Sequence, residues 1–457
     1  MTRYIYFIGI GGIGMSALAR YFTHAGAFVA GYDRAPSGIT AALEQEGVLI
    51  HYSDDVAQIP RPILEHPNDT LVIYTPAIPH DHTELSHLKQ KGYRIIKRSQ
   101  ALGEVADSKK CLAIAGTHGK TTTSTLLAHI FTHSGVGCTA FLGGISKNYQ
   151  TNLLTSNSPY LVAEADEYDR SFLQLHPYMA AVTAIDADHL DIFGNYQTLE
   201  EAFTRFVSQI KPNGTLVIKE GVHPPISVPA PFTQYRYALD RDSDFYASHI
   251  IQEDNGCYCF TLHLLNQIIQ DCRFSIPGRI NIENGVAASA LAFLNGITPA
   301  QIKAALASFS GVSRRFDIQV NRPDCIYIDD YAHHPAEISA TLHSIRSIYP
   351  DRNITVIFQP HLYTRTRDFA DDFGKSLSLP NELILLPIYP AREEPIKGIS
   401  SEVLLHRVTL KNKFLVDKEN VIDFLESRPI DVLVTLGAGD IDQLVPEIKT
   451  LLEEERV

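Results

Sequence analysis

Short runs of β-branched and aromatic residues alternate with longer segments of helical periodicity along almost the whole chain. This alternation is typical of βαβ units, in which helices connect parallel strands and cover both faces of the sheet. It therefore predicts an α/β protein. At 457 residues the chain is too long for one hydrophobic core, and ordinary domain sizes suggest about three domains.

The strand-like runs form three groups along the chain. The first extends from YIYFIGI to YRIIKRS, the second begins at KCLAIAGTHGKT, and the third follows FSGVSRRF. We expect three consecutive α/β domains: a Rossmann-like domain at residues 1–100, a P-loop ATPase-like domain at 101–313 and a Rossmann-like domain at 314–457. The alternating run CYCFTLHLL favours antiparallel strands or a sheet extension, and Gly296 is expected to end a helix.

Charge and composition exclude several classes of partner. The net charge is −13 without long Lys or Arg runs, which argues against a nucleic-acid or acidic-membrane surface. No run approaches the roughly 18 apolar residues of a membrane span, and no leader peptide is visible. The six scattered cysteines fit reduced thiols. We expect a soluble cytoplasmic protein that holds any anionic ligand locally, as a monomer or weak homo-oligomer.

Two glycine-rich loops follow predicted strands. GIGGIG places Gly9, Gly11 and Gly14 before a helix, and Asp33 ends the next strand; this pattern predicts a nucleotide diphosphate more than a purely structural turn, but NAD and a nucleotide-sugar fit it equally. AGTHGKTTTS has Ile114 where a P-loop has its first Gly. It keeps the other parts of a P-loop: backbone N–H groups that can surround an anion, Lys120, which can reach the phosphates, and Thr121, whose hydroxyl can bind Mg²⁺. The pattern therefore predicts binding of a nucleoside triphosphate more than a loop with a purely structural role.

Acidic residues follow two further predicted strands near this loop. EADEYDR carries Glu164, Asp166, Glu167 and Asp169, and DADHL carries Asp186, Asp188 and His189. They predict a Mg²⁺ site, with a solvated acidic rim as the alternative. The third domain begins with a basic group that could bind carboxylate or phosphate, or make surface salt bridges: Arg314, Arg315, His333, His334, His361, Arg365 and Arg367.

Ten motifs together resemble the Mur ligase family, in family order and over essentially the whole chain: GIGGIGM, GTHGKTTTS, EADEYDRSF, DADHLDIFG, NIENGVAA, FSGVSRRFD, DDYAHHPAE, FQPHLYTRT, YPAREEPI and LGAGDI. The resemblance is closest to the alanine-adding branch. It implies ATP-dependent joining of L-alanine to UDP-N-acetylmuramate, a step of peptidoglycan precursor synthesis, through an acyl phosphate and with release of ADP and phosphate. It also implies that the third domain closes over ATP.

The resemblance assigns roles residue by residue. Catalytic roles fall on Lys120, His189, His333 and Arg365, of which the last two would orient the amino acid. Mg²⁺ would be held by Thr121, Glu164 and His189. ATP would be bound by Gly116, Thr117, His118, Gly119, Lys120, Thr121, Thr122, Asn281, Asn284, Arg315, Asp330 and Tyr331. The UDP-sugar would be bound by Gly9, Gly11, Gly12, Ile13, Gly14 and Asp33.

The sequence departs from the commoner family pattern at Ala184, Ile280, Tyr168 and Leu362. Leu362 stands where many alanine-adding members carry an Arg, which leaves Arg365 to pair the amino-acid carboxylate. Residues 190–210 contain no Lys, unlike members with a carbamylated lysine there, which is consistent with alanine addition. Three alternatives stay open at this point: a ligase that recycles a murein tripeptide, a nicotinamide-dependent dehydrogenase built on GIGGIG, and a non-catalytic nucleotide switch.

Overall fold

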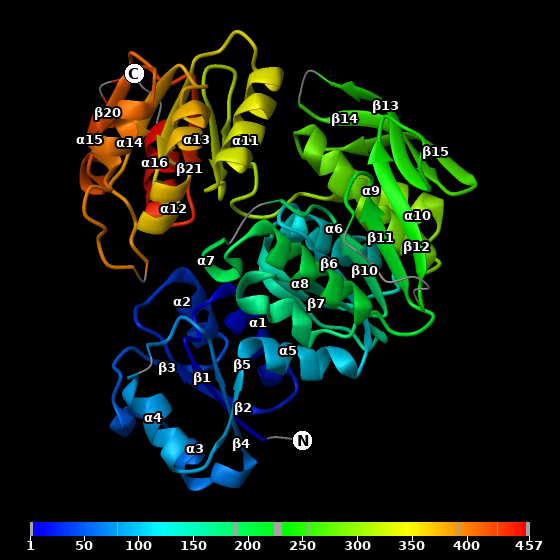
Figure 1. Cartoon of the computed structure of the whole chain (residues 1–457), viewed down its shortest axis with the longest axis vertical. Helices are drawn as coiled ribbons and strands as arrows, with labels where there is room; N and C mark the ends of the chain where they lie inside the picture. The colour runs from blue at the N-terminus through cyan, green and yellow to red at the C-terminus, as the bar shows by residue number, and fades with distance from the viewer. Residues whose placement is uncertain are drawn as a thin grey trace. The chain divides into compact units, whose positions relative to one another are not determined.

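The computed structural model describes residues 3–79, 81–186, 190–223, 231–253, 256–391, 393–426 and 428–453 (Figure 1). Their strands form three sheets joined mainly by helices, which confirms the predicted α/β class with three consecutive sheet domains. By contacts the chain divides into two compact units. Unit 1 comprises Met1–Ile251, Tyr258–Ser275 and Ile280–Ser310, and unit 2 comprises Gln252–Cys257, Ile276–Arg279 and Gly311–Val457.

The first sheet is parallel throughout and has the order β3-β2-β1-β4-β5. This is the Rossmann strand order without its sixth strand, and in such sheets ligands bind beyond the carboxyl ends of the strands. Its strands are β1 Tyr4–Ile8, β2 Phe28–Tyr32, β3 Leu49–His51, β4 Thr70–Tyr74 and β5 Arg94–Lys97. Its helices are α1 Ile13–His24, α2 Gly38–Gln45, α3 Arg61–Glu65 and α4 Thr83–Gln90, and α5 Arg98–Asp107 follows β5 directly.

The central sheet has the order β15-β14-β13-β12-β11-β10-β6-β9-β7-β8. The alternating segment extends this sheet, and its last pair, β14 and β15, is antiparallel as the pattern predicts. The strands are β6 Lys110–Ala115, β7 Thr139–Ser146, β8 Thr151–Leu154, β9 Tyr160–Ala165, β10 Met179–Val182, β11 Thr215–Lys219, β12 Thr233–Leu239, β13 Phe245–Gln252, β14 Tyr258–Leu264 and β15 Gln267–Phe274. The helices are α6 Lys120–His133, α7 Leu190–Phe193, α8 Tyr196–Ser208, α9 Arg279–Leu294 and α10 Pro299–Ser308.

The third sheet has the order β16-β17-β21-β18-β19-β20, and its four predicted strands pair in parallel. Only the edge strand β16 is antiparallel to its neighbour among the described pairs. The strands are β16 Asp317–Asn321, β17 Ile326–Asp330, β18 Ile354–Phe358, β19 Glu382–Leu385, β20 Lys413–Leu415 and β21 Val432–Leu436. The helices are α11 Pro335–Ile348, α12 Tyr363–Asp368, α13 Ala370–Ser376, α14 Ser401–Arg407, α15 Val421–Glu426 and α16 Val445–Glu453.

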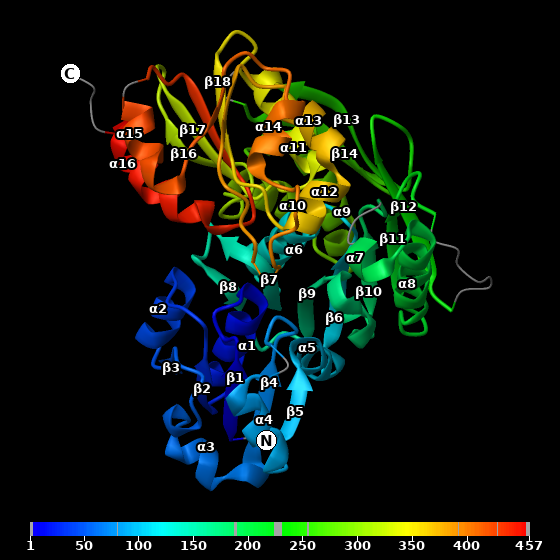
Figure 2. The same ribbon diagram turned by 60° about the vertical axis from the view of Figure 1, so that its left-hand side comes forward.

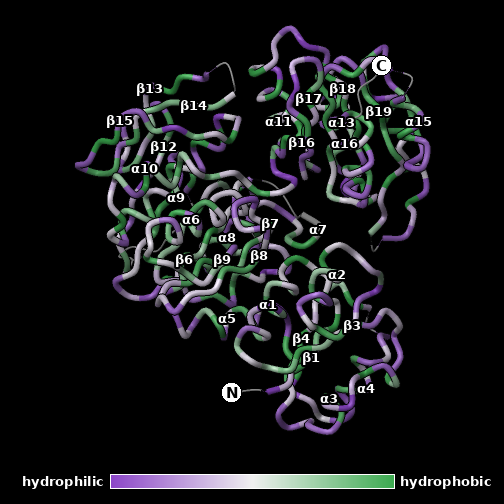
Figure 3. Tube along the Cα trace, turned by 180° about the vertical axis from the view of Figure 1, so that it is seen from behind, coloured by the Kyte–Doolittle hydropathy of each residue, from purple (hydrophilic) through white to green (hydrophobic). Residues whose placement is uncertain are grey.

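The central strands are hydrophobic and buried (Figure 3). Five of the six residues of β6 are buried, as expected for a parallel strand with helices on both faces. Gly296 has φ of +83° just after α9, in agreement with the predicted helix end. All six cysteines are free thiols. Across the described ranges, no helix has both the length and the apolar character needed to cross a membrane.

Helix α1 connects the first sheet to the central sheet (Figure 2). Its outer face packs on β7 and β8, where the rings of Tyr21 and Phe141 lie 5.4 Å apart. Buried hydrogen bonds also fix the orientation of α1 on this sheet. Arg20 Nη1 donates to Asn152 Oδ1 at 2.5 Å, and Asn152 Nδ2 donates to the carbonyl of Ile13 at 2.6 Å. One hydrophobic core therefore runs through both sheets, which explains why they belong to one compact unit.

The opposite face of the first sheet holds a buried polar cluster. Tyr6 donates through its hydroxyl to Glu84 Oε2 at 2.6 Å and lies 2.8 Å from His51 Nε2. The Glu84 side chain is fully buried. Burial raises the pKa of Glu84 to about 7, although the hydroxyl of Tyr6 and the backbone N–H of Asp55 oppose the shift. The carboxyl group is therefore largely protonated in the folded protein below neutral pH.

Replacing Glu84 by Gln should remove a pH-dependent loss of stability. A carboxyl group with a raised pKa in the folded state makes the protein less stable as the pH rises from its unfolded pKa to its folded pKa. At about 1.4 kcal/mol per pKa unit, the wild type should lose up to about 3 kcal/mol relative to Glu84→Gln between about pH 5 and pH 8. Calorimetric unfolding over this range measures the difference. Glu65→Gln, at an exposed position of α3, is the matched control. A stability difference between Glu84→Gln and the wild type that does not change with pH would contradict the raised pKa of Glu84.

Candidate functional site

The loop between β6 and α6 requires its two glycines. Gly116 and Gly119 have φ of +135° and +78°, values that L side chains rarely adopt. A Cβ at Gly116 would lie 2.1 Å from Thr183 Oγ1, and one at Gly119 would lie 2.4 Å from Asn284 Oδ1. The backbone of the loop therefore packs directly against the end of β10 and against α9. Neither position tolerates another residue without movement of these neighbours.

Lys120, the first residue of α6, is held in place by a buried acid. Its Nζ donates to Glu167 Oε2 and Oε1 at 2.8 and 2.9 Å and to the carbonyl of Gly116 at 2.8 Å. The Glu167 side chain is fully buried. Burial lowers the pKa of Lys120, but the carboxylates of Glu167, Asp166 and Glu164 together outweigh it, so the pKa lies above its ordinary value. The ammonium group is charged at neutral pH and points back over the loop.

The rest of the loop is tied to the segment after β10. The backbone N–H of Thr117 donates to the carbonyl of Ala184 at 3.0 Å, and Thr117 Oγ1 accepts from the N–H of Asp186 at 3.1 Å. His118 Nε2 lies 3.6 Å from a carboxylate oxygen of Asp186. A cavity of about 290 Å³ opens beside this segment, lined in part by Asp186, Glu200 and Lys219. The carboxyl ends of β6 and β10 thus meet at the loop, and the end of β11 lines the cavity beside them.

Thr121 and Glu164 form an oxygen pair beside Lys120. Thr121 Oγ1 donates to Glu164 Oε2 at 2.9 Å, and a Cβ at Gly143 would lie only 2.0 Å from that carboxylate oxygen. Gly143 on β7 therefore makes room for Glu164, a role that the sequence analysis missed. Hydroxyl and carboxylate oxygens are the donors that Mg²⁺ prefers, so this pair fits the predicted ion.

His189, the third predicted metal ligand, lies outside the described residues. Within the part of the chain that the structure describes, no three or more His, Cys, Asp or Glu side chains gather as a metal-binding group. The predicted Mg²⁺ site therefore rests on Thr121 and Glu164. Thr122, the next predicted ATP ligand, is largely buried on α6.

Two asparagines of α9 complete this part of unit 1. Asn281 and Asn284 are largely buried, with Asn284 Nδ2 3.4 Å from Asn281 Oδ1. Asn284 is also the side chain nearest to Gly119. The predicted ATP residues of the loop and of α9 therefore lie together, although about 160 residues separate them in the sequence.

The first glycine-rich loop is shaped by Asp33 and covered by Arg98. The N–H of Gly11 donates to Asp33 Oδ2 at 2.7 Å, and Gly9 has φ of +86°. Gly12 is the N-cap of α1 and Ile13 its first residue. A Cβ at Gly14 would lie 2.8 Å from Arg98 Nη1. The predicted pyrophosphate loop thus has a guanidinium beside it, which the sequence analysis used only to mark a domain boundary.

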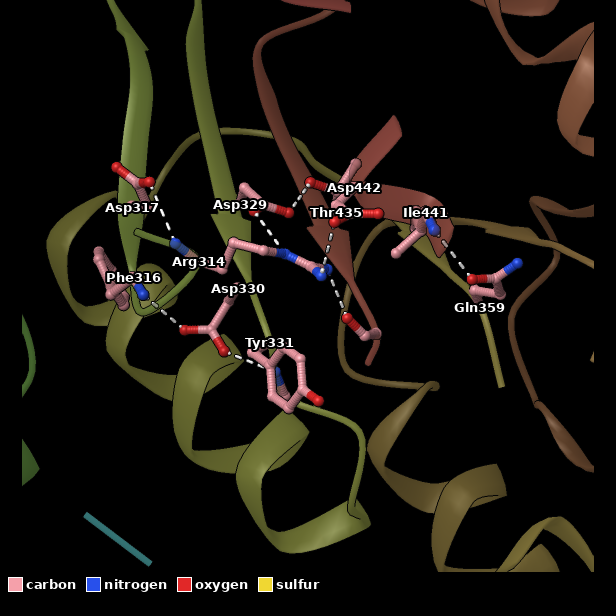
Figure 4. A network of polar contacts seen from close by, with 12 residues as sticks. Arg314, Phe316, Asp317, Asp329, Asp330, Tyr331, Gln359, Thr435, Ile441 and Asp442 are labelled. Carbon is pink, nitrogen blue, oxygen red and sulfur yellow. Dashed lines mark hydrogen bonds and ion pairs between the residues drawn. The ribbon is translucent and has the colours of Figure 1, made fainter. Parts of the chain in front are cut away.

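In unit 2, Arg314 and Asp330 organise the loops around β17 (Figure 4). Arg314 Nε lies 3.2 Å from Asp329 Oδ2 and its Nη2 donates to the carbonyl of Gly437 at 2.6 Å. Asp330 accepts from the N–H of Phe316 at 2.7 Å and of Ala332 at 2.8 Å. Burial raises the pKa of Asp330 to about 6, against the opposing effects of Arg315 and these two N–H groups.

Further predicted residues of unit 2 surround Tyr331 and His361. The guanidinium of Arg315 lies 4.9 Å from the Tyr331 ring centre, a cation–π distance. His333 Nδ1 lies 2.9 Å from the carbonyl oxygen of Tyr331, and its ring centre lies 6.2 Å from that of His361. Arg365 Nη1 lies 3.5 Å from His361 Nδ1. The two residues predicted to orient an amino acid, His333 and Arg365, therefore both approach His361.

His361 connects this cluster to Tyr389 and Leu362. Its ring stacks on that of Tyr389 with centres 5.8 Å apart. Leu362 is buried with φ of +72° and is the N-cap residue of the short helix α12. The QPH-L-Y motif marked His361 and Leu362, but no pattern placed Tyr389 beside them, because the contact depends on folding of the distant YPAREEP segment. Unit 1 thus holds the predicted phosphate-loop and UDP-sugar residues, and unit 2 holds Arg315, Asp330, Tyr331, His333 and Arg365.

A glycine-rich phosphate loop on a parallel sheet, with an oxygen pair at the first turn of the following helix, defines a P-loop α/β nucleotide-binding protein. Three family models narrow this class: Mur ligase family, catalytic domain, at residues 4–110, Mur ligase middle domain at 114–292, and Mur ligase, glutamate ligase domain, at 314–439. The chain belongs to the Mur ligase family.

Individual relatives agree with this assignment. The chain is 49% identical over 450 residues to the UDP-N-acetylmuramate--L-alanine ligase of Parabacteroides distasonis, covering 98% of this chain and 97% of that protein. Its fold resembles the crystal structure of the UDP-N-acetylmuramate-alanine ligase of Thermotoga maritima, with a TM-score of 0.83, 25% identity, and coverage of 99% and 100% of the two chains. A murein peptide ligase from Psychrobacter arcticus shares the fold at a TM-score of 0.73, 23% identity and full coverage of both chains.

Replacing Gly143 by Ala should displace the Glu164 carboxylate. The added methyl group cannot occupy a position 2.0 Å from Oε2, so either the carboxylate or β7 must move. Overpacking of this kind costs about 1–3 kcal/mol, and the melting temperature should fall by several degrees on calorimetry. Gly38→Ala is the matched control, because its Cβ would meet nothing within 4 Å. Equal melting temperatures for Gly143→Ala and the wild type would show that Glu164 has free space.

Proposed function

We propose that this protein is an ATP-dependent amide ligase that joins L-alanine to UDP-N-acetylmuramate and releases ADP and phosphate. The observation that carries the proposal is the set of groups around the phosphate loop: a charged Lys120 and the oxygen pair of Thr121 and Glu164 at one helix start. The sequence identity to alanine-adding ligases over nearly the whole chain supports the choice of substrates. We expect the reaction to take place in the cytoplasm, where ATP is available.

The proposed chemistry has two steps. The lactyl carboxylate attacks the γ-phosphorus of ATP, which forms an acyl phosphate and breaks the bond to ADP. The amine of alanine then attacks the acyl carbon, loses a proton, and phosphate leaves. Lys120 stabilises the charge on the transferring phosphoryl group, for which electrostatic positioning is the main source of catalysis.

Other side chains position the substrates. Thr121 and Glu164 would hold Mg²⁺, which neutralises phosphate charge when it is bound. The loop from Gly9 to Gly14 would bind the UDP pyrophosphate through its backbone N–H groups, with Arg98 as an added cation. Arg365 would pair the alanine carboxylate, and His333 would orient the amino acid. Asn281, Asn284, Arg315, Asp330 and Tyr331 would contact ATP.

The alternatives make different predictions in one assay. We would measure phosphate release from ATP and Mg²⁺ with each acceptor present or absent. Release that requires both UDP-N-acetylmuramate and free L-alanine is the expected result. Release with a murein tripeptide in place of alanine would indicate the recycling reaction, and release without an acceptor would indicate a nucleotide switch. A dehydrogenase leaves the Lys120 loop without a function, and NADH oxidation without phosphate release would be its sign.

Replacing Lys120 by Ala should reduce kcat at least about a hundredfold, because the charge that offsets the transferring phosphoryl group is lost. The measurement is acceptor-dependent phosphate release at saturating substrates. Lys303→Ala provides the control, since Lys303 is also a lysine of unit 1 and donates to the carbonyl of Gln270 on β15. Activity of Lys120→Ala close to that of Lys303→Ala would contradict the role of Lys120.

Replacing Arg365 by Ala should mainly raise the KM for L-alanine, by about tenfold or more, because a charge-assisted pair with the carboxylate is lost. The KM for ATP should change little. Arg367→Ala is a matched control on the same helix, because Arg367 is exposed and forms an ion pair with its neighbour Asp368. An unchanged KM for alanine in Arg365→Ala would remove Arg365 from the amino-acid site.

A further inference from the structure

One short acidic segment contacts both predicted anion sites of unit 1. Glu167 holds Lys120 of the phosphate loop with both oxygens. Two residues further along, Asp169 Oδ2 accepts from Lys97 Nζ at 2.9 Å, and Asp166 Oδ2 lies 3.9 Å from Arg98 Nη2. Lys97 and Arg98 join β5 to α5, and Arg98 lies against Gly14 of the first glycine-rich loop. The segment therefore contacts Lys120 of the phosphate loop as well as Lys97 and Arg98, the basic residues at the first glycine-rich loop.

The segment is locally stiff. Asp169 and Arg170 both have left-handed backbone conformations, with φ of 51° and 55°, which non-glycine residues hold only when their surroundings fix them. The N–H of Phe172 donates to the carbonyl of Asp166, and the N–H of Arg170 to that of Glu167, both at 2.8 Å. Phe172 anchors the segment in the core, stacked 5.0 Å from Phe206. A displacement of Glu167 is therefore transmitted to Asp166 and Asp169.

We propose that residues 166–170 are a positioning segment that couples the two nucleotide sites. This inference rests on the proposed function, which places ATP phosphates at Lys120 and a UDP pyrophosphate beside Arg98. Glu167, Asp169 and Asp166 act as positioning residues, because they act through Lys120, Lys97 and Arg98 respectively. Their carboxylates pair with the same cations that phosphate groups would need.

The direction of the coupling follows from this competition. The first nucleotide to bind must draw its cations away from the segment, which costs free energy and loosens the other contacts. The second nucleotide then meets cations that are already less restrained, so each nucleotide should increase the affinity for the other by the same factor. The Lys120–Glu167 contact should dominate, because it is buried, whereas the half-buried Lys97–Asp169 pair is partly screened by water.

Calorimetric titration tests the coupling in the full-length protein. A non-hydrolysable ATP analogue with Mg²⁺ is titrated with and without saturating UDP, and UDP is titrated with and without the analogue. In the wild type each ligand should lower the Kd of the other by about fivefold, near the lower end of typical coupling. Asp169→Asn should reduce the factor by which each ligand lowers the Kd of the other by about half or more. Glu167→Gln should bring this factor close to one, so that the two ligands bind independently. Both variants should still bind each nucleotide alone.

Asp107→Asn is the matched control, because Asp107 is also a half-exposed acid of unit 1, paired with His176 away from both loops. It should keep the wild-type coupling. If the wild type binds both nucleotides without coupling, or if both segment variants keep the wild-type factor, the inference is wrong. If Glu167→Gln does not fold, the coupling factor of Asp169→Asn alone tests the inference, and a wild-type factor in that variant would contradict it. A wild-type protein that binds neither nucleotide would overturn the proposed function, and the inference with it.

Discussion

The buried ion pair between Lys120 and Glu167 is the contact on which the arrangement of the phosphate loop depends. An ammonium group with this little exposure would lose its charge without a partner, and a fully buried carboxylate would gain a proton. Each group keeps the other ionised. The pair also fixes the first turn of α6 against the segment after β9 and so sets the distance between Lys120 and the neighbouring Thr121–Glu164 pair. In a chain of net charge −13, cations for a polyphosphate have to be provided by local pairs of this kind.

A second constraint is the attachment of α1 to the central sheet. Asn152 is fully buried and donates to both the carbonyl of Ile13 and Ser16 Oγ, while Arg20 donates to its amide oxygen. These bonds hold the helix start that carries the first glycine-rich loop. A buried amide with all of these partners specifies one orientation of the helix, whereas apolar contacts alone would allow sliding. The two glycine-rich loops of unit 1 therefore occupy fixed positions relative to each other, which a reaction between two nucleotide substrates requires.

The sequence was sufficient for the α/β class, for the four parallel strands of the third domain and for both glycine-rich loops, because strand periodicity and glycine spacing are local signals. It missed β3, whose three residues Leu49–His51 are too few to show a period. It also missed Gly143, Arg98 and Tyr389. Their roles come from contacts with residues far away in the chain: Gly143 leaves space for Glu164, Arg98 lies over Gly14, and Tyr389 stacks on His361. No local pattern encodes such contacts. The assigned ligand roles themselves stay predictions.

Asp33 and Asp330 show how an acid at a strand end can shape a loop and still have acceptor positions left over. Each follows or ends a strand of a parallel sheet, and each accepts two backbone N–H groups: Gly11 and Arg34 for Asp33, Phe316 and Ala332 for Asp330. Both acids were predicted from the sequence as nucleotide contacts. A carboxylate has about four acceptor positions, so two bonds to the backbone leave room for a ribose hydroxyl. The same bonds shape the loop around the ligand. Removing either carboxylate would therefore alter the loop as well as any direct contact, so loss of nucleotide binding after substitution by Ala would not distinguish the two functions. Substitution by Asn keeps one acceptor oxygen and separates them better, because it weakens only part of the backbone bonding.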